Sequence, residues 1–355
     1  MGEHLSRRNE KIDVLRGSAV LLMVWGHTIQ FMAAGNLDVF GNEAFRFIYS
    51  FHMPLFMILS GYVYGLGFDG HSVKELIIGR LWRIVYPCIL WGSAIYLFKQ
   101  GLNLAQGEIT FALLLRGWPA ALTEYWFLWG VGVYSFLFLP YKKLAGWGFA
   151  VLQVPLLVLV SFLPNSSSIL YMYPYFFCGF FIGHRNGKTK PQTVETKWVI
   201  TVSALLYPVL LLHYRTEHYI YETGVWLSGM QGGVHQIGID VFRWLIGFSG
   251  IAFIFILTET LLKQYGKYLN RLKQIFMWMG RISLEIYLVQ GFLFSQVAVR
   301  LLYHIPVDLV RLCGGKVMYT YLFCPVVTAL LIGGIGLFVW LINKSKVIRR
   351  ILMGK

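Results

Sequence analysis

The chain has 355 residues, of which 57% are hydrophobic and only 13% are charged, and its mean hydropathy is +0.61. These shares lie outside the usual range of soluble domains and predict an integral membrane protein. The 31 Lys and Arg residues and the 16 Asp and Glu residues give a net charge of +15. In a soluble protein this excess would suggest a nucleic-acid partner, but cytoplasmic loops of membrane proteins are themselves basic.

Apolar runs long enough to cross a bilayer, about 20 residues at about 1.5 Å each, recur along the chain. We expect an all-α, polytopic membrane protein with about ten transmembrane helices, in which residues 1–355 form a single integral-membrane domain. The predicted spans are residues 17–36, 45–67, 81–98, 125–140, 146–163, 169–184, 197–213, 237–260, 282–302 and 319–342.

The basic residues predict the orientation of these spans. If the N-terminus is cytoplasmic, 23 of the 31 Lys and Arg residues fall in cytoplasmic segments and 8 fall outside. The positive-inside rule then places both termini in the cytoplasm. We expect the protein to lie in the cell (inner) membrane. The charge is explained by topology, so we expect membrane lipid and no nucleic acid as a partner. The oligomeric state is left open.

The first span begins with RGSAVLLMVWGHTIQF (residues 16–31), which encloses a histidine in an apolar run. Arg16 and His27 are 11 residues apart, so on an ideal helix they differ by about 20° in direction and by roughly 16 Å in height. Both therefore lie on one helix face, with Arg16 at the cytoplasmic end. Ionisable residues at this depth are usually functional, although a histidine that joins two helices is the alternative.

A second basic cluster occurs in GRLWRIVYP, where Arg80 and Arg83 are one helical turn apart at the cytoplasmic start of the third span. Ordinary positive-inside anchoring would explain either arginine alone. Together with Arg16 they place three guanidinium groups at one end of the membrane, and guanidinium binds phosphate through paired hydrogen bonds. The cluster favours a phosphate-bearing, nucleotide-containing acyl donor.

The second span, which includes SFHMPLFMILSGYVYG, carries His52 near the expected depth of His27. The two histidines would share one cavity if their helices face each other. Pro54 is expected to kink the helix or to free a carbonyl there. We assign His52 a supporting role.

Five motifs occur in order: RNEKIDVLRGSAVLLMVWGHT, FHMPLFMILSGYVYG, GRLWRIVYP, YWFLWGVGVY and GRISLEIYLVQ. Together they resemble integral-membrane acyltransferase family 3, the ten-helix proteins that acylate sugars of cell-surface polysaccharides. The resemblance implies that His27 is the catalytic histidine, that Arg16 completes an Arg-x10-His motif, and that Arg80 and Arg83 handle the donor. It implies acyl-CoA, usually acetyl-CoA, as a cytoplasmic co-substrate, with no permanently bound cofactor.

The sequence departs from this family at the ninth span, where Gln290 stands in place of a frequent histidine. A proton-transfer role is therefore not carried over, and Gln290 is assigned a supporting role. The expected acceptor is the hydroxyl of a saccharide or a lipid-linked saccharide, whose identity the sequence leaves open. The four cysteines show no paired spacing, so no metal is expected.

In the predicted chemistry His27 takes the proton of the acceptor hydroxyl as it attacks the thioester, while a covalent acyl-histidine relay remains open. A histidine base needs a partner that orients it or stabilises its charge. The candidates in the membrane region are Glu285, Asp240, Arg243 and Glu124. A structural ion pair is expected of Asp240 and Arg243, because they are three residues apart. Glu285 is placed in the catalytic set, and Asp13 is expected to orient Arg16.

Two other classes of function fit parts of the pattern. A secondary transporter would also use intramembrane His, Arg and Glu, but no internal repeat is visible and the arginines lie at one end only. A non-enzymatic sensor or scaffold would explain the helices without explaining the alignment of Arg16 with His27.

Overall fold

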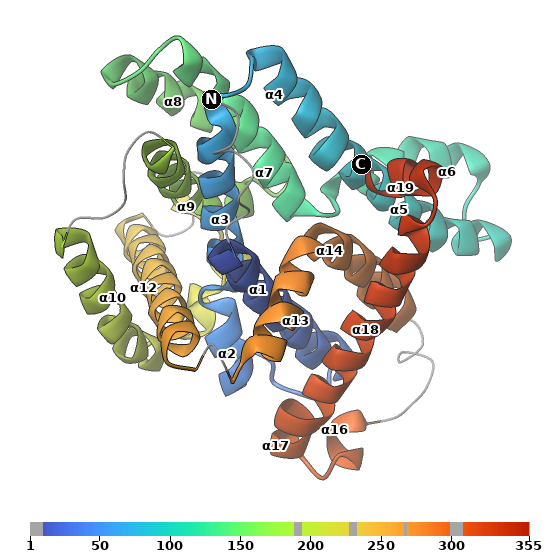
Figure 1. Ribbon diagram of the computed structural model, residues 1–355. Helices are drawn as coiled ribbons and strands as arrows, with labels where there is room; N and C mark the ends of the chain where they lie inside the picture. The colour runs from blue at the N-terminus through green and yellow to red at the C-terminus, as the bar shows by residue number, and fades with distance from the viewer. Residues whose placement is uncertain (1–9, 188–193, 227–232, 266–267, 299–307, 355) are drawn as a thin grey trace.

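The computed structural model describes residues 10–187, 194–226, 233–265, 268–298 and 308–354. Throughout these ranges the secondary structure is helical, and no strand occurs in them (Figure 1). The α-helices are α1 (Glu10–Met32), α2 (Glu43–Tyr49), α3 (His52–Phe68), α4 (Val73–Arg80), α5 (Tyr86–Ala105), α6 (Phe111–Gly117), α7 (Trp126–Leu137), α8 (Trp147–Val160), α9 (Ser166–Asn186), α10 (Val194–Leu212), α11 (Ile220–Thr223), α12 (Val234–Tyr265), α13 (Asn270–Arg281), α14 (Ser283–Phe292), α16 (Leu309–Leu312), α17 (Lys316–Met318), α18 (Cys324–Asn343) and α19 (Lys346–Met353).

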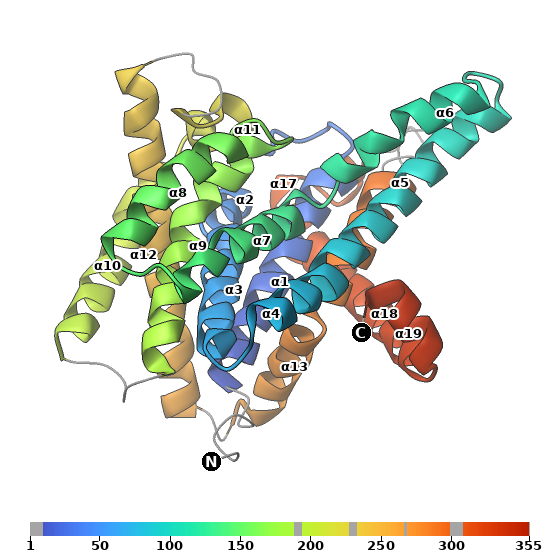
Figure 2. The same cartoon turned by 90° about the horizontal axis from the view of Figure 1, so that it is seen from above.

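Shorter helical turns join several of these helices. Turns of 3₁₀ type cover Trp118–Thr123, Leu139–Lys142 and Thr216–His218, and π-helical turns cover Leu81–Val85, Leu293–Ala298 and Tyr319–Phe323. Helix α1 lies near the centre of the molecule, between α10 and α12 on one side and α18 and α19 on the other (Figure 1). Seen from above, α5 and α6 extend away from the rest of the bundle (Figure 2).

The expected all-helical membrane fold is confirmed, but the ten spans are not. Within the described residues, five helices are long and apolar enough to cross a bilayer: Glu10–Met32, Glu43–Phe68, Val73–Ala105, Val234–Tyr265 and Lys316–Ile342. A sixth would be the pair Phe111–Thr123 and Trp126–Lys142, which is bent by 68°. The predicted span 146–163 forms only the 14-residue helix α8, about 21 Å long. The predicted span 282–302 changes from α-helix to a π-turn after Phe292, and its last residues lie outside the described ranges.

Pro54 lies in the first turn of α3, because the preceding helix ends at Tyr49 and a new one begins at His52. A proline is tolerated in a first turn, where its missing N–H has no helical partner to lose. The expected disturbance of the helix thus occurs just before the proline, as a break at Ser50 and Phe51.

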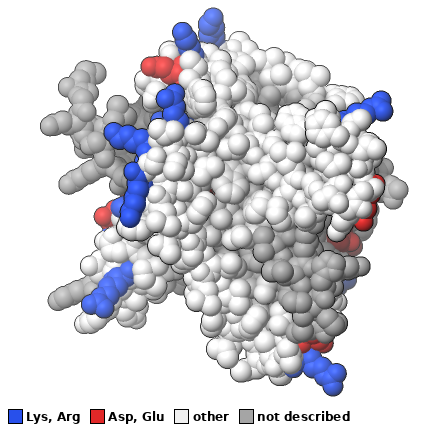
Figure 3. Space-filling model, turned by 90° about the vertical axis from the view of Figure 1, so that its right-hand side faces the viewer, with Lys and Arg blue, Asp and Glu red and all other residues white. Residues whose placement is uncertain are grey.

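The surface of the helices is largely uncharged. Leu205 on α10, Leu330 on α18 and Val154 on α8 keep 73%, 70% and 64% of their surfaces exposed. Figure 3 shows a face on which a broad uncharged area carries Lys and Arg mainly along its edges. Apolar side chains exposed in such numbers are expected of a surface that lies in lipid.

Helices α3 and α9 pack against each other through two matching Gly-x3-Gly motifs. Gly61 and Gly65 of α3 lie against the backbone carbonyls of Phe176 and Phe180. Likewise, Gly179 and Gly183 of α9 lie against backbone carbonyls of α3. Small residues spaced in this way let two helix backbones come into contact inside a membrane, where van der Waals packing drives association.

Helices α1 and α13 make a second contact of this kind. Gly17 lies against the carbonyl of Phe276, and Gly280 lies against the carbonyl of Asp13. Each glycine is next in sequence to an arginine, Arg16 or Arg281. The close approach of the two backbones therefore brings these two cations to the same place.

We expect Gly179→Ala to lower the stability of the protein by about 2 kcal/mol, because its Cβ would meet the Ile58 carbonyl and force α3 and α9 apart. The matched control is Gly333→Ala on α18, where a Cβ meets no atom within 4 Å. That change should be neutral or stabilising by up to about 1 kcal/mol. Thermal unfolding in detergent measures both, and equal midpoints for the two variants would contradict the packing argument.

Candidate functional site

A cavity of about 300 Å³ lies between α1, α3, α7, α13 and α14 and the segment around the first π-turn. Four arginines line it: Arg16, Arg80, Arg83 and Arg281. We call this cavity the arginine pocket. The sequence predicted that the first three would gather, and they do. Arg281, which belongs to the motif GRISLEIYLVQ, is a fourth member that the sequence analysis did not single out.

The π-turn Leu81–Val85 positions two of these arginines. Its backbone hydrogen bonds reach five residues back, as in the bond from Tyr86 N–H to the Leu81 carbonyl. Pro87 follows at once and has no N–H with which to continue the usual ladder. A π-turn changes the angle between successive side chains, and such turns are frequent at functional sites. Here Arg80 and Arg83 both reach the same cavity.

Contacts within the protein hold two of the guanidinium groups in place. The Arg80 guanidinium lies over the ring of Tyr64, 4.5 Å from its centroid, and the Tyr64 hydroxyl donates to the Ser135 carbonyl at 2.7 Å. The Arg281 Nε lies 3.5 Å from a carboxylate oxygen of Asp13, which is buried. Asp13 thus contacts Arg281, and its expected effect on Arg16 stays a prediction. Four arginine side chains around one cavity make the arginine pocket suited to an anion.

His27 lies farther along α1 and bonds to Gln290 of α14. The distance between His27 Nδ1 and Gln290 Oε1 is 2.8 Å, and the Gln290 amide nitrogen donates to the Tyr287 carbonyl at 3.3 Å. The second bond fixes the orientation of the amide, so its oxygen faces the histidine. A neutral His27 therefore carries its proton on Nδ1 and leaves Nε2 as a proton acceptor. The sequence analysis assigned Gln290 a supporting role but did not identify it as the partner of His27.

Helix α14 connects the arginine pocket with His27. Leu284 and Tyr287 line the pocket, and Gln290 lies three residues beyond Tyr287, about 4.5 Å farther along the helix axis. Arg16 and His27 lie on the unbroken helix α1 in the same way. The pocket and the histidine are thus neighbours along two helices.

Aromatic rings surround His27. Phe31, Phe294 and Tyr49 lie with their centroids 5.7, 6.0 and 6.4 Å from the imidazole. His52 is buried, donates from Nδ1 to the Ile48 carbonyl at 2.8 Å, and lies 4.8 Å from the Tyr49 ring. Both histidines therefore contact Tyr49.

The other predicted partners of His27 lie as follows. Glu285 is buried in the first turn of α14, where a carboxylate is favoured by the helix N-terminus, and its catalytic role stays a prediction. Glu124 lies at the bend between Trp118–Thr123 and α7. Asp240 and Arg243 form the expected ion pair, with 3.0 Å between Arg243 Nη1 and the carboxylate, and Arg243 is 1% exposed.

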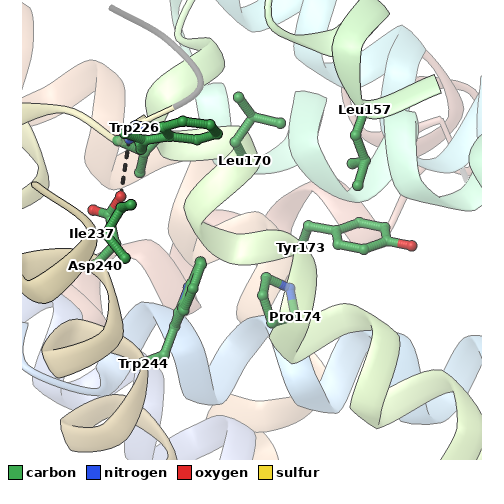
Figure 4. Close-up of a pocket in the computed structure, with 9 residues that line it drawn as sticks. Leu157, Leu170, Tyr173, Pro174, Trp226, Ile237, Asp240 and Trp244 are labelled. Carbon is green, nitrogen blue, oxygen red and sulfur yellow. Dashed lines mark hydrogen bonds between the residues drawn. The ribbon is translucent and has the colours of Figure 1, made fainter. Parts of the chain in front are cut away.

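Arg243 also holds the loop that precedes α12. Its guanidinium donates to the carbonyls of Glu217, His218, Tyr219 and Gly224 and to the Thr223 hydroxyl. Asp240 accepts from the backbone N–H of Trp226 at 2.9 Å, a bond visible in Figure 4. The pair thus fastens the segment from Glu217 to Trp226 to α12.

A second cavity of about 330 Å³ lies beside this pair and has a largely apolar lining, which includes Tyr173, Trp226 and Trp244 (Figure 4). Its carboxylate, Asp240, already bonds to Trp226, Gln236 and Arg243. Because its polar group is satisfied by the protein, this cavity shows no chemistry comparable to that of the arginine pocket.

Comparison with known proteins finds a matching family and similar proteins. The model of a family described as an acyltransferase domain matches residues 9–343. Nodulation protein NolL of Mesorhizobium japonicum is 25% identical over 301 residues, which cover 81% of this chain and 77% of that protein. Nodulation protein NolL of Sinorhizobium fredii is 25% identical over 365 residues, which cover 98% of this chain and 93% of that protein. No solved structure matches the chain.

The family match extends from the first described helix to the last long one, and it includes the arginine pocket, His27 and Gln290. The chain therefore belongs to acyltransferase family 3 and is a membrane acyltransferase.

Proposed function

We propose that the protein transfers an acetyl group from cytoplasmic acetyl-CoA to a hydroxyl of a saccharide or lipid-linked saccharide, with His27 as the catalytic base. The observation that carries the proposal is the arrangement of a four-arginine pocket and a hydrogen-bonded histidine along the same two helices, α1 and α14. A donor with phosphates at one end and a thioester at the other matches this arrangement. The proposed location is the cell (inner) membrane, with both termini in the cytoplasm.

In this proposal the arginine pocket binds the phosphates of the donor. Arg83 and Arg281 are the more exposed of its cations, and Arg16 and Arg80 are partly buried. Guanidinium groups stay charged and form paired hydrogen bonds with phosphate oxygens, so they suit this role better than lysines would. The pantetheine arm then extends along α1 and α14 towards His27.

The proposed reaction is a direct acyl transfer. His27 Nε2 takes the proton of the acceptor hydroxyl while that oxygen attacks the thioester carbonyl carbon. The new C–O bond forms, the C–S bond breaks, and the CoA thiolate leaves and receives the proton from the imidazolium. Gln290 accepts a hydrogen bond from Nδ1–H throughout, which keeps Nε2 available and orients the ring.

We expect His27→Ala to reduce acetyl transfer by about 10²- to 10⁴-fold, because the variant lacks the base that activates the hydroxyl. Label transfer from radioactive acetyl-CoA to endogenous acceptors in membranes measures it, with equal expression and thermal unfolding as folding controls. The matched control is His235→Ala, since the His235 side chain is 76% exposed. Full activity of the His27 variant would contradict the mechanism, and a wild type without any transfer would favour a transporter instead.

Gln290→Met should lower kcat by about 10- to 100-fold with little change in the KM for acetyl-CoA. Methionine keeps the length of the side chain but removes the oxygen that accepts from His27 Nδ1–H. Gln290→Glu restores an oxygen acceptor and should recover part of the rate. A variant whose KM rises while its kcat is unchanged would show that Gln290 does not act through His27.

Arg281→Gln should raise the KM for acetyl-CoA by about tenfold and leave kcat nearly unchanged, because it removes one phosphate-binding cation. Arg116→Gln on α6 is the matched control, since Arg116 is exposed and does not line the arginine pocket. Steady-state kinetics with acetyl-CoA as the varied substrate measure both. An equal KM in the two variants would exclude Arg281 from donor binding.

A further inference from the structure

We infer that Tyr49 and Tyr221 form an acceptor wall, on which Tyr221 binds the sugar unit next to the one that is acylated. The inference rests on the proposed function of His27 and adds a binding residue for the acceptor. It concerns the loop between α10 and α12, which carries Tyr221 on the short helix α11.

The rings of Tyr221, Tyr49 and His27 follow one another in space and connect this loop with the histidine. The Tyr221 ring lies 6.3 Å from the Tyr49 ring, which lies 6.4 Å from the His27 imidazole. Tyr221 is separated from the histidine by one ring. A sugar whose hydroxyl reaches His27 would therefore lie over Tyr49, and the next sugar unit would lie over Tyr221.

Tyr221 keeps 55% of its surface exposed. Burial nevertheless raises the pKa of its hydroxyl well above the ordinary value, with further contributions from Tyr49 and Tyr219. The Tyr221 ring thus combines access to solvent with contact to Tyr49. Tyr268 lies on another loop and is 85% exposed, so it serves as the control for Tyr221.

Residues 217–226 are held in one conformation before any ligand binds. Arg243 donates to the Tyr219 carbonyl at 2.8 Å and to the hydroxyl of Thr223, so it fixes the backbone two residues before and two residues after Tyr221. A preorganised aromatic residue costs little conformational entropy on binding. In this arrangement Arg243 is a positioning residue.

The chemistry of the acceptor wall favours a saccharide. Tyr49 and Tyr221 present rings that carry hydroxyl groups, and the Tyr49 hydroxyl donates to Gln30 Oε1 at 3.0 Å. Sugar rings have apolar C–H faces with hydroxyls at their edges, which match aromatic faces with polar tips. A purely aliphatic acceptor would gain nothing from these hydroxyls.

The test compares acceptors of one and two sugar units. Methyl glycosides of common hexoses and the corresponding disaccharides are offered to the purified wild type and to the variants Tyr221→Ala, Tyr221→Phe and Tyr268→Ala. We expect Tyr221→Ala to raise the KM for the disaccharide about tenfold. The KM for the methyl glycoside and for acetyl-CoA should stay unchanged, and Tyr221→Phe should resemble the wild type because it keeps the ring.

A binding measurement separates this inference from the proposed function. The disaccharide is titrated into the His27→Ala protein with and without Tyr221→Ala. Weaker binding without the Tyr221 ring supports the acceptor wall, even if no acetyl transfer is found and the proposed function fails. Equal binding with and without the ring, or no binding of any disaccharide, overturns the inference, and so does a disaccharide KM in Tyr221→Ala that equals the value in Tyr268→Ala.

Discussion

The contact of helix backbones through glycine is the constraint on which the site depends. Gly17 and Gly280 let α1 and α13 approach until backbone meets backbone, and they bring the neighbouring Arg16 and Arg281 to one cavity. Larger residues would hold the helices apart and separate the charges. Lipid offers no hydrophobic force between helices, so close van der Waals contact has to supply the association energy. The same contact that stabilises the bundle thus concentrates its positive charge, which a bound anion would neutralise.

The neutral side chain of Gln290 orients the imidazole of His27. Gln290 accepts from His27 Nδ1–H as a carboxylate would, but without adding a charge to the apolar surroundings of Phe31 and Phe294. A buried carboxylate would cost desolvation energy and would stabilise the protonated imidazole. An amide orients the ring and sets its tautomer at a lower cost. Its own orientation follows from the bond to the Tyr287 carbonyl.

Sequence reasoning found the features that depend on spacing within one helix. Arg16 and His27 share α1, Arg80 and Arg83 reach one pocket, and Asp240 pairs with Arg243 across three residues. It missed contacts between distant parts of the chain, such as Gln290 with His27 and Arg281 with Asp13, because no local pattern records them. It also counted apolar runs as spans, whereas breaks at turns, prolines and π-turns decide how long each helix becomes. Composition therefore predicted the class of protein better than the number of its spans.

The buried guanidinium of Arg243 donates hydrogen bonds to backbone carbonyls that would otherwise need water. The segment from Glu217 to Gly224 consists mainly of single helical turns, whose last carbonyl groups have no partner within the helix. The five N–H donors of Arg243 serve six acceptors, namely four backbone carbonyls, a hydroxyl and the Asp240 carboxylate, so at least one donor is shared. One side chain thus takes the place of a layer of water around residues 217–224. These short turns can lie against α12 without the hydration that their free carbonyl groups would otherwise require.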